Sequence, residues 1–236
     1  CTFAVEGFGN VGSHLARILH EKGAKVIALS SSNGAIYDRN GLDVPDIFEK
    51  FSESKRLGQY EKAKHIAPAE LLELEVDVLC PCAIDSTINS QNMEQIKARI
   101  VCAGANNPVT LAADDYFFEH DILYLPDFMT NAGGALGNMV KFAGLKESHF
   151  HRLIDEQFTA KIFEVYRRSV EDGIPPREAG VRMADKKFAE MKAAKEKVSS
   201  SNALYEFALS IYRRGFIPKI LLRPLAFRQM QNLIAR

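Results

Sequence analysis

Short apolar runs alternate with segments of helical length from the first residues to Leu125, and this alternation predicts an α/β fold with a doubly wound, largely parallel sheet. A GxGxxG sequence at residues 7–12 lies between the first apolar run and the first helical segment, where a Rossmann fold has its strand-to-helix turn. Helical patterns alone follow Asn131, which predicts a C-terminal helical extension. Right-handed crossovers between parallel strands should place helices on both faces of the sheet.

The glycine-rich turn is the feature around which the other elements are arranged. The first strand is expected at residues 3–5. Gly7 permits the tight turn out of that strand, Gly9 lets the backbone approach a pyrophosphate, and Gly12 lets helix and strand pack closely. The helix that begins here presents free N–H groups and a partial positive charge to phosphates. Four apolar residues fall on one face of this helix: Val11, Leu15, Ile18 and Leu19.

The second strand, at residues 25–30, decides how the glycine turn is interpreted. A lone GxGxxG is weak evidence, but a strand about 20 residues on gives it the context of a dinucleotide site. This strand ends in three serines, Ser30 to Ser32, and no carboxylate precedes Asp38 to hold ribose hydroxyls. Serine hydroxyls can bond a ribose or a 2′-phosphate, and Arg39 is the nearest arginine that follows. The choice between NAD and NADP therefore stays open.

The remaining elements complete the alternation. An extended piece at residues 35–41 leads to an amphipathic helix at 42–55, and a short helix begins near Pro68. The buried stripe of the helix at 42–55 is expected to be Leu42, Ile47, Phe48 and Phe51. Strands are expected at 76–80, 99–102 and 122–125, and helices at 90–98 and 111–120; Pro81 should end the strand before it. Ligands of such sheets sit beyond the carboxyl ends of the strands, so the following should lie along one rim: residues 7–12, 31, 83, 104–106 and 127–134.

The C-terminal part of the chain has a different pattern. Residues 131–134 open a helix, and the apolar and aromatic stripe of 150–172 indicates core or interface packing. A break at 173–176 precedes a charged surface helix at 177–197, and the basic last stretch is interpreted as a solvated helix face. We therefore expect a dinucleotide-binding Rossmann domain at 1–147 and a helical segment at 148–236 that packs on it.

Composition narrows the class of protein. The 236 residues carry 30 basic and 30 acidic side chains, so the field of the whole chain gives no attraction to nucleic acid or an anionic membrane. No apolar run reaches the roughly 20 residues that span a bilayer, and no signal peptide precedes the first strand. Cys80, Cys82 and Cys102 are interpreted as buried reduced thiols, which favours a cytoplasmic protein. Because the chain begins at Cys1 and enters a strand at once, we expect it to be part of a longer protein.

Several segments, taken in order, resemble the cofactor-binding (C-terminal) domain of the glutamate/leucine/phenylalanine/valine dehydrogenase family. The similar segments lie between residues 2 and 137: Val5-Glu-Gly-Phe-Gly-Asn-Val-Gly12, Gly34-Ala-Ile-Tyr-Asp38, Asp77-Val-Leu-Cys-Pro-Cys-Ala83, Ile96-Lys-Ala-Arg-Ile-Val101, Gly104-Ala-Asn-Asn107, Ile122-Leu-Tyr-Leu-Pro-Asp127 and Asn131-Ala-Gly-Gly134. Residues 174–184 look like its C-terminal helices, whereas 198–236 have no match. Pro-Cys-Ala at 81–83 and Ala-Asn-Asn at 105–107 look nearer the branched-chain and aromatic members.

The resemblance implies oxidative deamination of an L-amino acid to a 2-oxo acid and ammonia, with hydride passed to NAD or NADP. It also implies a homo-oligomer for the full-length protein. The cofactor residues that it implies are Gly7 in the turn, Phe8, Gly9, Asn10, Val11 and Gly12 at the pyrophosphate, Ser31 by the adenosine ribose, Ala83 and Ile84 in the adenine–nicotinamide cleft, and Asn106 and Asn131 near nicotinamide and substrate. An asparagine amide bonds a carboxamide or carboxylate without titrating, although these two could instead cap a turn and a helix.

The sequence departs from the family at two positions and lacks its catalytic part. Ser31 stands where the family usually has an aspartate, and Ala103 where glutamate-type members have a glutamate. The catalytic lysine and aspartate of the family lie in an N-terminal substrate domain with no match here, and none of the six histidines replaces them. We therefore assign no catalytic residue and no metal ligand, and expect the chain alone to be inactive.

Two other functions compete with this interpretation. A non-catalytic sensor would bind a dinucleotide and transmit its occupancy to a partner, and the sequence upstream of this chain would distinguish it from the enzyme. A different Rossmann oxidoreductase is the second alternative, but the block at residues 131–134 argues against it.

Overall fold

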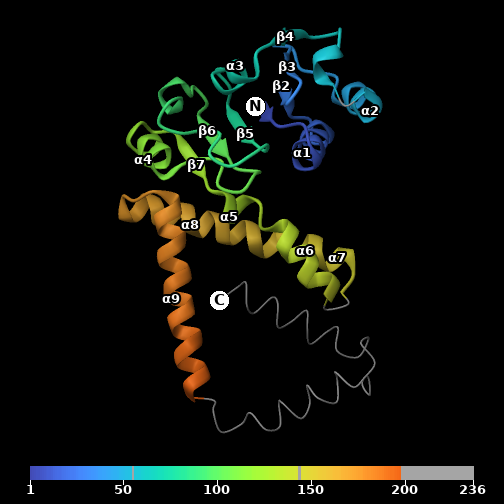
Figure 1. Ribbon diagram of the computed structural model, residues 1–236. Helices are drawn as coiled ribbons and strands as arrows, with labels where there is room; N and C mark the ends of the chain where they lie inside the picture. The colour runs from blue at the N-terminus through green and yellow to red at the C-terminus, as the bar shows by residue number, and fades with distance from the viewer. Residues whose placement is uncertain (55, 143–144, 198–236) are drawn as a thin grey trace. The chain divides into compact units, whose positions relative to one another are not determined.

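The computed structural model describes residues 1–54, 56–142 and 145–197 (Figure 1). The chain divides into two compact units, Cys1–Asn131 and a second that begins at Ala132. Each unit has a hydrophobic core of its own. Among the described residues, no helix combines the length and the apolar character needed to cross a membrane.

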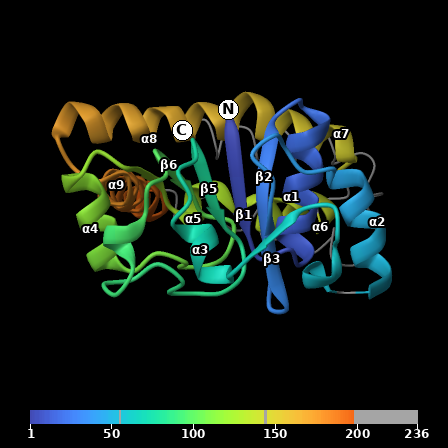
Figure 2. The same ribbon diagram turned by 90° about the horizontal axis from the view of Figure 1, so that it is seen from above.

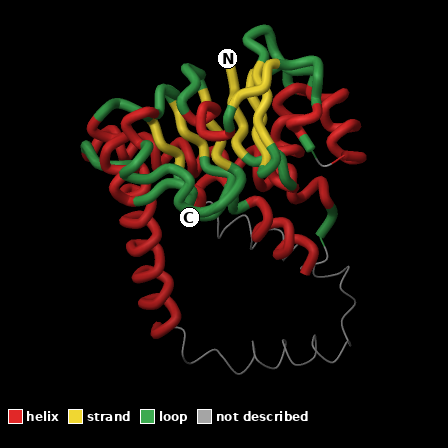
Figure 3. The backbone as a smooth tube through the Cα atoms, turned by 45° about the horizontal axis from the view of Figure 1, so that its top comes forward, coloured by secondary structure: helices red, strands yellow, loops and turns green. Residues whose placement is uncertain are grey.

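In its described part, the first unit contains a seven-stranded sheet with the order β4-β3-β2-β1-β5-β6-β7. Its parallel strands are β1 (Thr2–Glu6), β2 (Lys25–Ser31), β5 (Val78–Pro81), β6 (Ile100–Cys102) and β7 (Leu123–Leu125). β3 (Gly34–Tyr37) runs antiparallel to β2, and β4 (Lys64–Ile66) runs antiparallel to β3. Figure 3 shows the strands side by side in yellow. The predicted α/β fold with a largely parallel sheet is confirmed.

Helices cover both faces of the sheet because successive strand residues point to opposite sides. Ala4 belongs to one core, together with residues of α3 (Pro68–Leu72) and α4 (Leu111–Glu119). Val5 belongs to the other, together with residues of α1 (Asn10–Glu21) and α2 (Val44–Ser54), which pack side by side (Figure 2). All four residues of the stripe predicted for the helix at 42–55 join this core, since Leu42 and Ile47 are buried and Phe48 and Phe51 pack against the cluster, although Leu42 precedes the observed start of α2.

The apolar face predicted for α1 is only half buried. Val11 and Ile18 are 52% and 44% exposed, and the buried residues of the helix are the small ones, Gly12, Ser13 and Ala16. Small side chains let the helix approach the sheet closely, and this close approach determines which face turns inward. Apolar periodicity does not reveal this inward face, because it weights large side chains above small ones.

The predicted helix at residues 90–98 is wrong. The segment forms only a short 3₁₀ turn, η2 (Met93–Gln95), because asparagine side chains bond the backbone around it. The Asn89 N–H donates to Asn92 Oδ1 at 2.8 Å, and Asn92 Nδ2 donates to the Thr87 carbonyl at 2.9 Å. Pro81 also differs from expectation, since it is the last residue of β5 and pairs with Glu6 of β1.

The second unit is helical in its described part. Its helices are α6 (Gly133–Phe142), α7 (Glu147–Arg152), α8 (Thr159–Asp172) and α9 (Pro176–Lys197), with a π-helical segment, η3 (Leu153–Phe158), between α7 and α8. Leu153 is fully buried among Leu136, Val140 and Leu145, whereas Phe163 of the predicted stripe is 67% exposed. The basic last stretch lies outside the described residues, so its interpretation as a solvated helix face stays a prediction.

Candidate dinucleotide site

The predicted site residues of the first unit follow the carboxyl ends of the parallel strands. The chain passes from β1 to β2 on one side and later to β5 on the other, so the strand order reverses between β1 and β5. Ligands of open α/β sheets bind in the crevice at such a reversal. The loops after β1, β5 and β6 meet there, as does α5 (Asp127–Thr130), which follows β7. In Figure 3 these loops gather, in green, beyond the end of the strands opposite the N-terminus.

Gly7 and Gly12 are required by the fold itself. Gly7 has a φ of +91°, and a Cβ atom there would lie 2.7 Å from Ala83. A Cβ on Gly12 would collide with the carbonyl oxygen of Gly7 and lie 3.2 Å from Val5 Cγ1. The tight turn and the close helix–strand packing predicted for these two glycines are confirmed.

Gly9 has no such structural reason to be glycine. Its φ of −90° is open to any residue, and a Cβ there would meet no atom of the described chain within 4 Å apart from those of its immediate chain neighbours. Gly9 is exposed and is the N-cap residue of α1. The Cβ of a side chain at this position would project into open space beside the start of the helix, where a bound group could otherwise lie.

The N-terminus of α1 is open to an anion. Within the described chain, no side chain caps the helix and its first turn contains no acidic residue. The Gly7 and Phe8 N–H groups are already used, since they donate to Ser30 Oγ at 3.2 Å and to the Ser30 carbonyl at 2.6 Å. Helical bonding then starts with the Ser13 N–H, which donates to the Gly9 carbonyl at 3.0 Å. The N–H groups of residues 10–12 precede that bond and are free to hold a negatively charged group.

Phe8 differs from the other residues assigned to the pyrophosphate. Its ring is 1% exposed and packs edge-on against Phe51 with the ring centroids 5.1 Å apart. Asn10 and Val11 are exposed on the first turn of α1. Phe8 thus supports the loop from beneath, whereas Asn10 and Val11 lie at its surface.

The loops after β5 and β6 form the opposite wall of the crevice. Ala83 and Ile84 are exposed there, Ile84 by 65%. A Cβ on Gly104 would collide with Cys82 Sγ and lie 3.5 Å from Val11 Cγ1. Gly104 is therefore a further close-packing glycine, and it brings the β6 loop against both the β5 loop and the start of α1.

An amide pair joins the β6 loop to the end of α5. Asn131 Nδ2 donates to Asn106 Oδ1 at 2.6 Å and to the Ala105 carbonyl at 3.3 Å. These two bonds use both hydrogens of the Asn131 amide, which leaves its Oδ1 as an acceptor and the Asn106 Nδ2 as a donor. Such a pair is complementary to a carboxamide, which also has one acceptor and one donor side. The Asn131 amide nitrogen therefore bonds the β6 loop, and neither of these two bonds caps a helix end.

Two further side chains of α5 hold the same loop; their range, 127–134, was predicted to lie along the rim, but these bonds were not predicted. Thr130 Oγ1 donates to the Ala103 carbonyl at 2.5 Å, and Asp127 Oδ2 accepts from the Asn107 N–H at 3.0 Å. Ser30, which orders the glycine turn from β2, was also missed. Ser30 and Asp127 are polar residues at or just after an apolar strand, a pattern that marks them as candidates without showing which groups they bond.

Ser31 and Arg39 lie at opposite ends of β2. The Ser31 hydroxyl accepts from the Asn33 N–H at 3.3 Å and is half-buried at the carboxyl end of the strand. Next to Arg39, the Asp38 N–H donates to the Ile27 carbonyl at 2.9 Å. Ile27 is four residues before Ser31, or about 13 Å along a strand. Arg39 therefore cannot act as a phosphate clamp at Ser31.

The cysteines of the strands are free thiols, as predicted. Cys80 and Cys82 are buried and Cys102 is half-buried. Burial, with a smaller contribution from the Glu6 carboxylate, raises the pKa of Cys82 to about 12. Cys82 is therefore a protonated, unreactive packing residue beneath the crevice.

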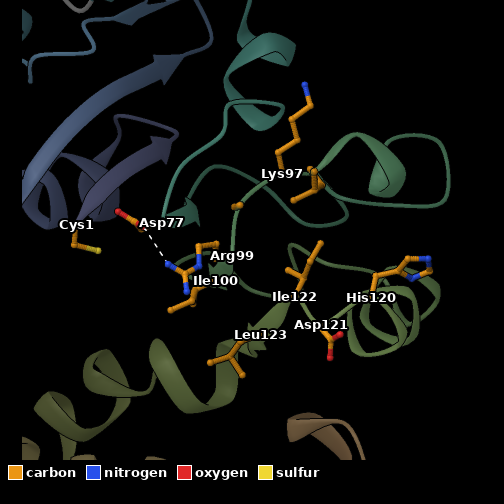
Figure 4. A pocket seen from close by; sticks show the side chains of 11 residues that line it. Cys1, Asp77, Lys97, Arg99, Ile100, His120, Asp121, Ile122 and Leu123 are labelled. Carbon is orange, nitrogen blue, oxygen red and sulfur yellow. Dashed lines mark ion pairs between the residues drawn. The ribbon is translucent and has the colours of Figure 1, made fainter.

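A pocket of about 650 Å³ lies at the other end of the sheet (Figure 4). It is lined at the amino ends of β5, β6 and β7 by residues that include Asp77, Arg99 and Leu123. Arg99 Nη1 lies 3.8 Å from Asp77 Oδ1, an ion pair between exposed groups that is weak in water. This pocket is remote from the glycine turn and belongs to a different edge of the sheet.

Comparison with known proteins gives consistent matches. Residues 1–196 match the family described as Glutamate/Leucine/Phenylalanine/Valine dehydrogenase. The chain is 40% identical over 141 residues to a glutamate dehydrogenase of Aeropyrum pernix, a match that covers 60% of this chain and 34% of the relative. It is 44% identical over 134 residues to that of Thermotoga maritima, covering 56% and 32%. The matches thus span about a third of the length of these curated relatives.

Solved structures share the fold. The hetero-hexameric glutamate dehydrogenase of Thermus thermophilus superposes with a TM-score of 0.67 and 23% identity, covering 75% of this chain and 43% of that one. The L-tryptophan dehydrogenase of Nostoc punctiforme superposes with a TM-score of 0.65 and 25% identity, covering 81% and 52%. At these identities the likeness chiefly concerns the fold.

Proposed function

This chain belongs to the Glutamate/Leucine/Phenylalanine/Valine dehydrogenase family, and from that premise we propose that its Cys1–Asn131 unit binds NAD or NADP at the crevice between β1 and β5. In the full-length protein it would act in the oxidative deamination of an L-amino acid to a 2-oxo acid and ammonia. Bound nicotinamide would supply the hydride acceptor. Which amino acid is used stays open, because the relatives compared include both glutamate and tryptophan dehydrogenases.

The observation that carries this proposal is Gly9. Its backbone conformation and its surroundings accept a side chain, so the fold sets no demand for glycine there beyond the ordinary preference for a small or polar residue at an N-cap. A pyrophosphate at the uncapped N-terminus of α1 does account for it, because the phosphate oxygens must approach the backbone N–H groups of the first turn. The loop therefore combines two glycines that the fold needs with one that the ligand needs.

The other site residues would each contact a different part of the cofactor. Ala83 and Ile84 would flank its rings with apolar surface, and Ser31 would lie by the adenosine ribose. The acceptor of Asn131 and the donor of Asn106 would bond the nicotinamide carboxamide and so orient the ring. Oriented binding of this kind is how a protein positions the reactive atom of a cofactor. Phe8 would act through packing, since its ring is buried.

We also propose that the full-length protein is a homo-oligomer in the cytoplasm. The Thermus relative is described as hetero-hexameric, which supports association as a property of related proteins without fixing the number or kind of subunits here. The boundaries 1–147 and 148–236 for the cofactor domain and the helical segment likewise remain part of the proposal.

The isolated chain should bind NAD or NADP and should not catalyse deamination. Binding rests on the open phosphate loop, and inactivity rests on the absence of any sequence match to the substrate domain. The measurement is calorimetric titration with both cofactors, followed by an absorbance assay of cofactor reduction with a panel of L-amino acids. Absence of binding to either cofactor would overturn the proposed function, and amino-acid-dependent reduction would overturn the claim of inactivity.

Replacing Ser31 by aspartate should shift the NAD-to-NADP affinity ratio toward NAD by about tenfold. A carboxylate accepts bonds from ribose hydroxyls and repels a 2′-phosphate, and repulsion at a half-exposed site is on the order of 1–2 kcal/mol. The wild-type chain, with neither a carboxylate at Ser31 nor Arg39 within reach of it, should discriminate weakly between the cofactors. Aspartate can keep the bond from the Asn33 N–H, so the turn should persist.

The shift is measured by titrating both cofactors against both proteins in one buffer. Ser31→Asn is the matched control, because it has the shape of aspartate without its charge and should leave the ratio within about twofold of wild type. An unchanged ratio in Ser31→Asp would show that Ser31 is not at the ribose.

A further inference from the structure

Glu6 is an acidic residue at the point where the proposed cofactor's phosphates would approach. It is the last residue of β1 and directly precedes Gly7. Its Oε2 accepts from the Ala83 N–H at 3.2 Å, and its backbone carbonyl accepts from the Cys82 N–H at 2.7 Å. The side chain thus joins β1 to the β5 loop across the place where the strand order reverses.

The carboxylate is held in surroundings that disfavour its charge. Burial raises the pKa of Glu6, and the N–H groups of Ala83 and Cys82 lower it only in part, so that the pKa stays above its ordinary value. Among the described residues, no lysine or arginine contributes to this shift. The charge is therefore stabilised by backbone N–H groups alone, without a counter-ion.

The groups that surround Glu6 carry little charge of their own. Directly after β5 the neighbouring titratable group is the Cys82 thiol, which is neutral because its pKa is raised. On β2 the neighbour is the uncharged Ser30 hydroxyl, and the first turn of α1 contains no acid. On α3, which packs against β1, Glu70 is exposed and bonds the Ala67 N–H at 2.9 Å. Glu6 is thus a half-buried carboxylate of this crevice, whereas the buried carboxylate of α5, Asp127, accepts from the Asn107 N–H at 3.0 Å.

We propose that Glu6 takes up a proton when a dinucleotide pyrophosphate occupies the N-terminus of α1, so that cofactor binding is linked to proton uptake. This inference rests on the proposed function. Two phosphate charges beside a half-buried carboxylate without a counter-ion repel it, and protonation removes the repulsion. The protonated acid keeps a carbonyl oxygen that still accepts from the Ala83 N–H, so the geometry of the turn is retained.

The sign of the linkage follows from the two pKa values of Glu6. The value is already raised in the free chain by burial, and bound phosphates raise it further. Between the free and the bound value, binding takes up protons and the affinity falls as the pH rises. Below both values Glu6 is neutral throughout, and above both it is ionised throughout, so the affinity is constant in each range.

The test is calorimetric titration of the full chain with NAD, over a pH series, in two buffers of different ionisation enthalpy. NAD is used because it has no 2′-phosphate to titrate. The wild type should take up a fraction of a proton that peaks between the two pKa values, whereas Glu6→Gln should lack this component. Glu6→Gln should bind about tenfold more tightly than wild type at alkaline pH and equally at acid pH, since tenfold corresponds to one pKa unit.

Asp85→Asn is the matched control, because it removes an exposed carboxylate from the same β5 loop and should keep the proton uptake of the wild type. In the wild type itself, the carboxyl carbon signal of Glu6 should titrate at higher pH with NAD bound than without. NAD binding with equal proton uptake in wild type and Glu6→Gln, or a Glu6 pKa that NAD does not raise, overturns the inference and leaves the proposed function standing. Failure of every variant to bind NAD overturns the proposed function instead.

Discussion

Gly9→Val should lower the affinity for NAD and NADP by more than about a hundredfold, a loss of about 3 kcal/mol, while the chain stays folded. The valine side chain would fill the open space beside the first turn of α1, where no atom of the described chain beyond the immediate chain neighbours lies within 4 Å of a Cβ. The phosphates could then no longer reach the N–H groups of residues 10–12. Because the φ of −90° suits a β-branched residue, the loss of stability should stay near the 1 kcal/mol typical of a changed N-cap.

Calorimetric titration measures the affinity, and circular dichroism with a thermal melt measures the fold. Gly9→Ala should fall between wild type and valine, because its single methyl group obstructs less. Lys25→Val is the control for the change to valine itself, since Lys25 is exposed at the amino end of β2 and away from the crevice. If Gly9→Val bound the cofactor with wild-type affinity, the glycine turn would not be the pyrophosphate site.

Gly12→Ala should chiefly lower the stability of the fold, whereas Gly9→Val should chiefly lower cofactor affinity. The new methyl group would collide with the carbonyl oxygen of Gly7, a backbone atom that cannot rotate away, and would press on Val5 Cγ1. Overpacking of this kind costs about 1–3 kcal/mol and more where the backbone must move, which outweighs the gain of about 1 kcal/mol from alanine in a helix. We expect a net loss of about 2 kcal/mol or a fall in Tm of roughly 4–8 °C.

Thermal and urea unfolding measure this loss. Asn10→Ala is a suitable control because Asn10 is exposed in the same helical turn and its replacement should leave Tm within a degree or two. A Gly12→Ala protein as stable as wild type would show that α1 has room to move away from β1. In that case the close packing seen between them is not a requirement of the fold.

Sequence reasoning was most successful where burial alone decides the structure. The parallel strands were located to within one or two residues, because fully buried strands consist of continuous apolar runs. β4 was missed because an edge strand with Lys64 and exposed His65 lacks that signal. The helix predicted at 90–98 failed at Asn89 and Asn92, whose side-chain bonds to the backbone are invisible to periodicity.

The candidate site was predictable to the extent that glycine spacing encodes backbone geometry. The spacing located Gly7, Gly9 and Gly12, but only the structure separates the two that the fold requires from the one that it does not. The bonds from Thr130 and Asp127 to the β6 loop join residues 20 or more positions apart. No local pattern contains that information, because it arises from the sheet order.

Ser30 has a consequence for how a ligand would bind. By accepting the N–H groups of both Gly7 and Phe8, it fixes the conformation of the glycine turn during folding. The conformational entropy of that turn is therefore lost before any ligand arrives, and association has no disordered loop to organise. In this turn, shape and cofactor choice depend on different residues. Ser30 holds the backbone of the phosphate loop, so Ser31 can be replaced to change the cofactor preference without changing the shape of the loop.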